Sequence, residues 1–273
     1  MSNQHTALIQ LLGDDDPDTV AMVKEQLLEI GSDALPKIKA LIHVDDVRVA
    51  RHAKEILDRI ESTQADQEFT LLCHLFPEDG DLENASWLLA RALIPGIETD
   101  EAAHQLDVWG RELGEILHGV QNATAVVRNM ARYISGDLGF RGNADDYYNP
   151  RNSLLPAVIG SRLGIPVTMT LLYILLGKRV GKPVVGINLP GHFIARYDDV
   201  FFDPFNEGMQ LSATDCEAIL AKQDLAMQAH FLDSANPRQI LHRMLVNLAH
   251  IYNQQEINAQ RLQIGAWLKA LSR

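Results

Sequence analysis

Apolar residues are densest between Gly164 and Arg179, where their pattern predicts a turn followed by a buried helix. Ile165-Pro166 opens this helix, and the segment 181–183 (GKP) ends it. The apolar positions are nearly continuous rather than confined to one stripe: Val167, Met169, Leu171, Leu172, Ile174, Leu175 and Leu176. We therefore expect the helix to be covered on all sides by the rest of the chain.

Three short strands are predicted after this helix, over residues 184–189, 192–197 and 200–203. Turn residues separate them, and the last two form a hairpin with the loop Asp198-Asp199. A two-residue loop fixes the pairing of the hairpin: Tyr197 with Val200, Arg196 with Phe201, Ala195 with Phe202 and Ile194 with Asp203.

His192 and Asp203 fall on one face of the hairpin in this register, in diagonal positions. Diagonal neighbours lie roughly 7 to 8 Å apart at their backbones, a distance that long polar side chains bridge. We therefore predict a hydrogen bond between the imidazole and the carboxylate. Such a carboxylate fixes the imidazole tautomer, as a general base that serves a nucleophile requires.

Helical patterns occupy both sides of this region. In residues 1–62, the segments 23–30 and 53–60 align with a spacing of thirty, and Pro17 and Gly31 bound the first helix. This segment resembles a pair of HEAT-type repeats, and a helical cap docked on the rest of the chain is favoured over a dedicated partner-binding surface. Residues 63–138 carry amphipathic stripes that face a core, and Cys73 lies in one of them as a structural thiol.

Four sequence motifs carry a family resemblance: Asn152-Ser153, the GIP at 164–166, the NLPGHF at 188–193 and the DPF at 203–205. Together they resemble the SirB-type branch of the transglutaminase-like superfamily, which implies an α+β, predominantly helical fold with a papain-like core and a small antiparallel sheet. On this basis residues 63–230 form the transglutaminase-like domain, with a helical lead-in at 63–138 and a core at 139–222. Residues 231–273 form a helical hairpin that resembles tetratricopeptide repeats.

The chain departs from this family where the nucleophile belongs. The resemblance implies a cysteine at the start of the buried helix, assisted by His192 and Asp203, but Pro166 stands there and Thr168 carries one of the nearest hydroxyls. Asn152 lies at the start of a helix predicted over about 151–163, where either capping or an oxyanion-binding role explains it. Cys216, thirteen residues after Asp203, reaches His192 only if its helix folds back over the hairpin.

Composition narrows the classes of partner. The formal net charge of −12 argues against nucleic acid and against anionic membrane surfaces. Two cysteines, no secretory signal and no apolar run long enough to span a bilayer indicate a cytoplasmic protein. The sequence contains no phosphate-binding glycine loop, zinc-protease motif or Cys-x-x-Cys, so we expect no cofactor and no metal.

Two functions remain open. The missing thiol favours a non-catalytic binding or regulatory protein with a protein or peptide partner, since a hydroxyl is a much weaker nucleophile than a thiolate near neutral pH. The alternative is a cysteine-independent hydrolase or transferase acting on amide or peptide bonds. In that case His192 is the general base, Asp203 orients it, Asn152 or a backbone N–H binds the oxyanion, and Thr168 or an activated water attacks.

Overall fold

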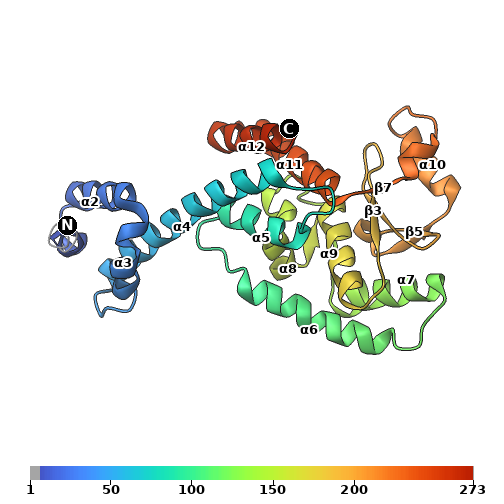
Figure 1. Cartoon of the computed structure of the whole chain (residues 1–273), viewed down its shortest axis with the longest axis horizontal. Coiled ribbons are helices and arrows are strands. Elements are labelled where there is room, and N and C mark those ends of the chain that lie inside the picture. The colour runs from blue at the N-terminus through green and yellow to red at the C-terminus, as the bar shows by residue number, and fades with distance from the viewer. Residues whose placement is uncertain (1–6, 273) are drawn as a thin grey trace. The chain divides into compact units, whose positions relative to one another are not determined.

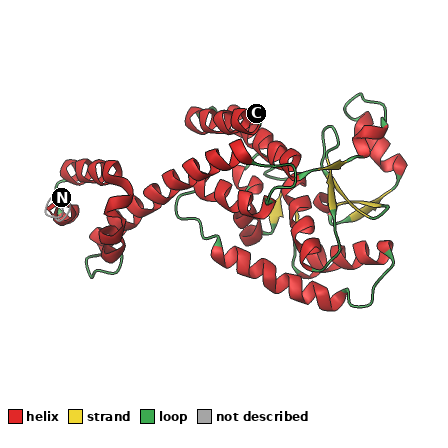
Figure 2. Cartoon of the chain, viewed as in Figure 1, coloured by secondary structure: helices red, strands yellow, loops and turns green. Residues whose placement is uncertain are grey.

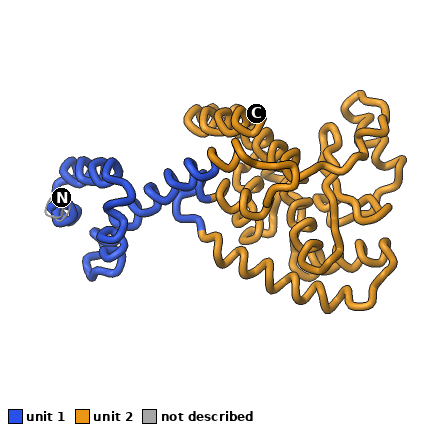
Figure 3. The backbone as a smooth tube through the Cα atoms, in the orientation of Figure 1, with its two compact units in different colours: residues 1–69, 91–97 blue, residues 70–90, 98–273 orange. Residues whose placement is uncertain are grey.

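The computed structural model describes residues 7–272 and divides them into two compact units (Figure 3). Unit 1 comprises residues 1–69 and 91–97, and unit 2 comprises residues 70–90 and 98–273. One helix, α4 (Val47–Leu75), contains the boundary that the sequence predicts at residue 62. The three-segment division at residues 62 and 230 therefore stays a prediction.

Unit 1 is a helical bundle with its own apolar core (Figure 1). Its helices before α4 are η1 (Leu11–Gly13), α2 (Pro17–Ile30), η2 (Gly31–Ala34) and α3 (Leu35–Leu41). The predicted start and stop of α2 are confirmed: the Asp16 side chain caps the N-terminus, Pro17 follows it, and Gly31 ends the helix at φ 64°. Buried side chains such as Leu27, Ile38 and Ile56 form the core.

Unit 2 holds the predicted site and most of the helices: α5 (Leu82–Leu93, which ends in unit 1), α6 (Asp100–Ile116), α7 (Ala123–Ala131), the π-helical turn η3 (Arg132–Asp137), η4 (Pro150–Ser153), α8 (Leu155–Ser161), α9 (Pro166–Arg179), η5 (Pro204–Asn206), α10 (Ala213–Ala221), η6 (Ala229–Leu232), α11 (Pro237–Gln254) and α12 (Asn258–Leu271). The helix predicted over 151–163 is wrong as one element, because Leu154 has extended backbone angles that separate η4 from α8.

Five strands of unit 2 form one small sheet beside the helices (Figure 2). They are β3 (Val185–Ile187), β4 (Ile194–Tyr197), β5 (Val200–Asp203), β6 (Met209–Leu211) and β7 (Ser234–Ala235), in the order β6-β5-β4-β3-β7 with antiparallel neighbours. A separate parallel pair joins β1 (Arg141–Gly142) to β2 (Leu163–Gly164). The predicted α+β, predominantly helical class is confirmed.

Helix α9 lies against one face of the sheet, as its continuous apolar cover predicted. It packs between α6 and strands β3 and β4, and the ring of Tyr173 contacts that of Phe202 with centroids 5.4 Å apart. The opposite face packs on α10, where Ile187 and Ile194 meet Cys216 and Leu220. The sheet is therefore packed between helices on both faces.

The hairpin register is confirmed for the pairs Ala195 with Phe202, Arg196 with Phe201 and Tyr197 with Val200. The prediction that His192 lies on a strand is wrong, because β4 begins at Ile194. Pro190 has no N–H to donate, Gly191 has φ 77°, and the His192 N–H donates to the Leu189 carbonyl at 3.1 Å. The backbone hydrogen bond of His192 therefore closes a turn instead of joining the sheet.

Candidate functional site

His192 and Asp203 form the centre of the candidate site. The Nε2 atom of His192 lies 2.7 Å from Oδ2 of Asp203, so the predicted contact is present. The turn that ends at His192 and the end of β5 bring the two residues together. The geometry therefore matches the sequence prediction, although the turn before β4 produces it rather than the alternation of side chains along a strand.

The carboxylate of Asp203 is buried, with 2% of the residue exposed, and four hydrogen-bond donors surround it. Oδ2 accepts from His192 and from Nδ2 of Asn206, both at 2.7 Å. Oδ1 accepts from the N–H groups of Phe205 at 3.0 Å and Asn206 at 3.3 Å, which caps η5. Burial raises the pKa of Asp203, but its bonds to His192 and Asn206 and the charge of His192 lower the pKa more, so the net shift is downward.

His192 is the exposed partner of this pair, since 15% of its side chain reaches solvent. Its ring meets the ring of Phe205 edge to face, with centroids 6.2 Å apart. Within residues 7–272, Nδ1 of His192 has no hydrogen-bond partner and is not one of the buried unpaired atoms. When Nε2–H donates to Asp203, Nδ1 carries the lone pair and faces outward, which is the arrangement of a general base.

Thr168 does not meet this pair in the structure. Its buried hydroxyl donates to the carbonyl of Asn152 at 2.6 Å and accepts the N–H of Ile165 at 3.1 Å. These bonds cap the first turn of α9 and join it to η4. The hydroxyl is occupied by backbone groups, and no bond to His192 is found among the described residues.

Asn152 also makes hydrogen bonds within its own loop; it does not cap the helix, and its oxyanion-binding role stays a prediction. Asn149, not Asn152, supplies the cap of η4. The Asn152 amide nitrogen donates to the carbonyl of Asp146 at 2.7 Å, and its amide oxygen accepts from Nδ2 of Asn143 at 3.0 Å. The side chain therefore holds the loop before η4 in place.

Neither thiol is placed as the missing nucleophile. Cys216 is buried in the apolar cluster between α10 and the sheet, and burial, then the charge of Asp215, raises its pKa. Cys73 is buried as predicted, and burial raises its pKa to about 12. Both thiols are protonated near neutral pH and shielded from solvent, which makes them unreactive.

Sequence reasoning did not place Asn206 beside the pair, and it named Phe205 only as part of a family motif. The segment Asp203 to Asn206 (DPFN) carries a signal that could have revealed them, because an Asp before Pro is a strong cap for a short helical turn. Ser153, which the sequence motif joins to Asn152, has a buried hydroxyl with no hydrogen-bond partner in the described chain. No sequence signal separates such a hydroxyl from an ordinary buried serine.

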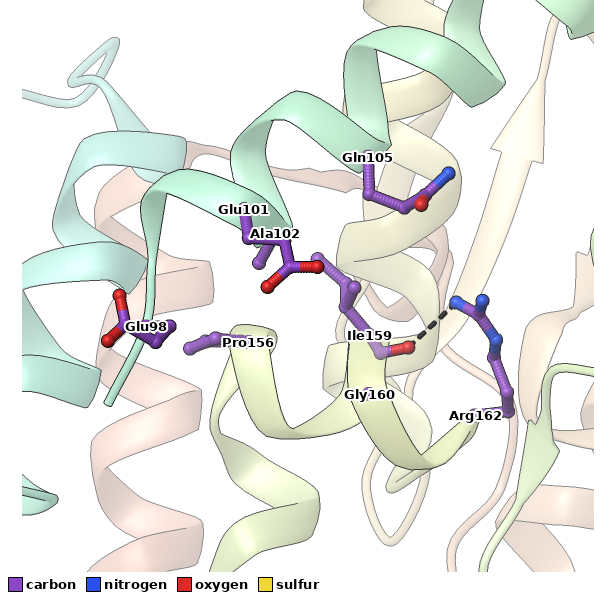
Figure 4. A pocket seen from close by; sticks show the side chains of 8 residues that line it. All are labelled: Glu98, Glu101, Ala102, Gln105, Pro156, Ile159, Gly160 and Arg162. Carbon is purple, nitrogen blue, oxygen red and sulfur yellow. Dashed lines mark hydrogen bonds between the residues drawn. The ribbon is translucent and has the colours of Figure 1, made fainter. Parts of the chain in front are cut away.

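A hollow of about 320 Å³ opens elsewhere on unit 2, between the start of α6 and helix α8 (Figure 4). Figure 4 shows Glu98 and Glu101 on one side and Arg162 across from them, with Nη1 of Arg162 donating to the Ile159 carbonyl at 2.7 Å. Neither member of the His-Asp pair lines this hollow.

Within residues 7–272, no three His, Cys, Asp or Glu side chains gather closely enough to hold a metal ion. Nor does any helix of this part of the chain combine the length and apolar character needed to cross a bilayer.

Comparisons with known proteins give the family. A family model described as "Transglutaminase-like superfamily" matches residues 100–246, more than half of the chain and the whole candidate site. No solved structure matches the chain significantly.

Curated relatives match over overlapping parts. A UPF0162 protein of Xylella fastidiosa (strain Temecula1) is 39% identical over 132 residues, 44% of this chain and 47% of the relative. A UPF0162 protein of Pseudomonas aeruginosa is 32% identical over 176 residues, 63% of this chain and 64% of the relative. F-box only protein 21 of Mus musculus is 31% identical over 145 residues, 48% of this chain and 23% of the relative.

The match to the Xylella protein spans about half the length of that relative. The family model, in contrast, contains α9, the sheet and both members of the His-Asp pair. On this evidence the chain belongs to the transglutaminase-like superfamily.

Proposed function

We propose that this chain is a non-catalytic binding protein of the SirB-type branch, in which the face around His192 receives a peptide or a segment of a partner protein. Residues 1–62, as HEAT-like repeats, and residues 231–273, as a tetratricopeptide-like hairpin, add further partner surfaces in this proposal. The cytoplasm is the compartment in which we place it.

One observation carries the proposal: the imidazole and carboxylate are assembled, but no nucleophilic side chain is placed beside them. Nδ1 of His192 has no hydroxyl or thiol partner among the described residues. The hydroxyl of Thr168 is bound to backbone groups, and the thiol of Cys216 is buried in an apolar cluster. Covalent catalysis needs a nucleophile within hydrogen-bond reach of its base, and these contacts argue against one.

A second function is favoured by a different observation, the openness of the same nitrogen. Because Nε2 of His192 is held by Asp203 and Nδ1 reaches solvent, the imidazole is oriented to accept a proton from water. This supports a cysteine-independent hydrolase or transferase acting on amide or peptide bonds. Water then replaces the thiol as the nucleophile.

The two functions are separated by assaying the full chain against its His192→Ala variant. Turnover is measured as incorporation of a fluorescent primary amine into a glutamine-containing peptide, and as hydrolysis of the same peptide followed by mass spectrometry. Binding is measured by amide chemical-shift changes of the ¹⁵N-labelled protein. His118→Ala serves as the matched control, because His118 is exposed on unit 2 and has no bond to the site.

We expect no turnover from the parent chain. We also expect peptide-induced shifts that centre on His192 and Asp203 and weaken in His192→Ala but not in His118→Ala. Turnover that disappears only in His192→Ala would establish the hydrolase or transferase. Absence of binding by every peptide would contradict the binding function.

A further inference from the structure

Arg243 carries a positive charge beside the candidate site that has no acidic partner in the described chain. It lies on α11, is half-buried, and its Nη1 donates to Oδ1 of Asn188 at 2.8 Å. Among residues 7–272, no carboxylate forms an ion pair with it, and Nε and Nη2 donate no hydrogen bond. These two nitrogens are not among the buried unpaired atoms, so they remain open to a ligand.

Two other half-buried arginines of unit 2 have partners for their charge. Arg179 makes ion pairs with Glu83 at 2.7 Å and Asp107 at 2.8 Å. The guanidinium of Arg162 stacks over the ring of Trp109 at 4.3 Å and donates to a backbone carbonyl. Arg243 has neither a carboxylate nor a stacked ring, and a half-buried charge in this state is unfavourable until something pairs with it.

Two sets of neighbouring residues lie between Arg243 and His192. Asn188 directly precedes the turn from Leu189 to His192, so the Arg243 contact lies next to the start of that turn. In the other set, the ring of Tyr147 contacts Phe205 with centroids 6.1 Å apart, and Phe205 contacts His192.

The charge of Arg243 also affects the pKa of Tyr147. Burial raises the pKa of Tyr147, and the nearby guanidinium offsets part of that rise. Burial in turn lowers the pKa of Arg243, and Tyr147 offsets part of that fall. Asn188, by a hydrogen bond, and Tyr147, by its electrostatic interaction, therefore link Arg243 to the surroundings of His192.

We propose that Arg243 binds a carboxylate of the peptide or protein segment that occupies the His192 face. This inference rests on the proposed binding function and specifies its ligand as an anionic peptide. A guanidinium presents a planar fork of donors that matches a carboxylate, and Nε and Nη2 are the donors left over here. The chain has a net charge of −12, which repels anions in general. An unpaired cation at this position would therefore direct an anionic ligand to this site.

The test uses the full chain and three acetylated peptides: a tetra-alanine with a free C-terminal carboxylate, the same peptide amidated, and an amidated peptide containing one glutamate. Dissociation constants are measured by NMR titration. We expect the parent chain to bind at least one carboxylate peptide about tenfold more tightly than the amidated tetra-alanine. The comparison between the two carboxylate peptides shows whether the terminus or an acidic side chain is the source.

Two variants remove the preference by opposite means. Arg243→Gln deletes the charge, and Asn188→Asp gives Arg243 an internal carboxylate in place of the Asn188 oxygen that now lies 2.8 Å away. Both are expected to bind all three peptides within about twofold of one another. If Arg243→Gln fails to fold, Asn188→Asp still tests the idea. Arg261→Gln, an exposed arginine on the adjacent helix α12, is the control that keeps the preference.

The possible results distinguish the role of Arg243 from the proposed peptide-binding function. A parent chain that binds all three peptides equally, or a preference that survives in either variant, overturns the role of Arg243 and leaves the binding function intact. A parent chain that binds none of the peptides overturns both.

Discussion

Replacing Asp203 with alanine tests whether the His-Asp pair is part of the framework of unit 2. The carboxylate accepts four hydrogen bonds, so its removal leaves the His192 imidazole, the Asn206 amide and two backbone N–H groups without their partner. Loss of a cap costs about 1 kcal/mol, and each buried donor left unsatisfied costs about 1–3 kcal/mol. Water entering beside His192 recovers part of this, and we expect Asp203→Ala to lower the free energy of unfolding by about 3–5 kcal/mol.

Asp203→Asn separates the charge from the shape. The asparagine keeps an oxygen for the two backbone N–H groups but turns an amide toward Nε2 of His192 and Nδ2 of Asn206, so we expect a smaller loss of about 1–2 kcal/mol. The pKa of Asp203 is lowered in the folded state, so the stability that its charge contributes is present above its usual value of 3.8 and is lost as pH falls through the folded-state pKa. The difference between parent and Asp203→Asn should therefore shrink as the pH falls below about 4.

Urea unfolding followed by tryptophan fluorescence measures these losses, because Trp87, Trp109 and Trp267 all lie in unit 2. Asp215→Ala is the control, since Asp215 caps α10 from an exposed position. The reasoning is refuted if Asp203→Ala costs no more than the control, or if the difference between parent and Asp203→Asn stays unchanged down to pH 3.

Three further predictions follow from burial and backbone geometry. Cys73 and Cys216 should resist a thiol reagent such as dithionitrobenzoate in the folded chain at pH 7.5 and react only after unfolding in urea, because both are buried and their pKa values are raised. Gly208→Ala should cost about 2–4 kcal/mol, since φ is 72° and the added Cβ would meet that of Ala131 at 2.5 Å; Gly181→Ala, at φ 65° with open space, should cost only about 1–2 kcal/mol in the same urea assay. Arg179→Met should lower the urea midpoint by an amount that shrinks in high salt, because Arg179 joins α9 to acidic residues on α5 and α6.

The elements that local pattern determines were predictable from sequence. The continuous apolar cover from Val167 to Leu176 predicted α9, and the two-residue loop Asp198-Asp199 fixed the register of the hairpin. The register also predicted the contact between His192 and Asp203, although the turn before β4 positions His192 in the structure. The spacing of apolar residues and the residues of a tight turn are local features of a few residues each. A single sequence is therefore enough to predict the elements that they determine.

The errors concern turns and tertiary partners. His192 was assigned to a strand that was predicted to begin directly after Pro190-Gly191. In the structure β4 begins only at Ile194, so His192 belongs to the turn. Asn152 and Thr168 have the chemistry of site residues, yet each satisfies a polar group on a neighbouring segment. Such pairings depend on which segments meet in space, and sequence spacing does not give that information.

The contacts of Asp203 change how the retained pair should be interpreted. In sequence, an imidazole and a carboxylate without a nucleophile suggest a catalytic role. In the structure, the carboxylate caps η5, accepts a hydrogen bond from Asn206 and binds the imidazole of His192. It therefore has a structural role that does not depend on any reaction. The same bonds hold Nε2 of His192 and leave Nδ1 without a hydrogen-bond partner among the described residues. A scaffold that must hold its carboxylate to fold keeps an oriented imidazole as a consequence, and that imidazole is then available to bind a ligand without any covalent step.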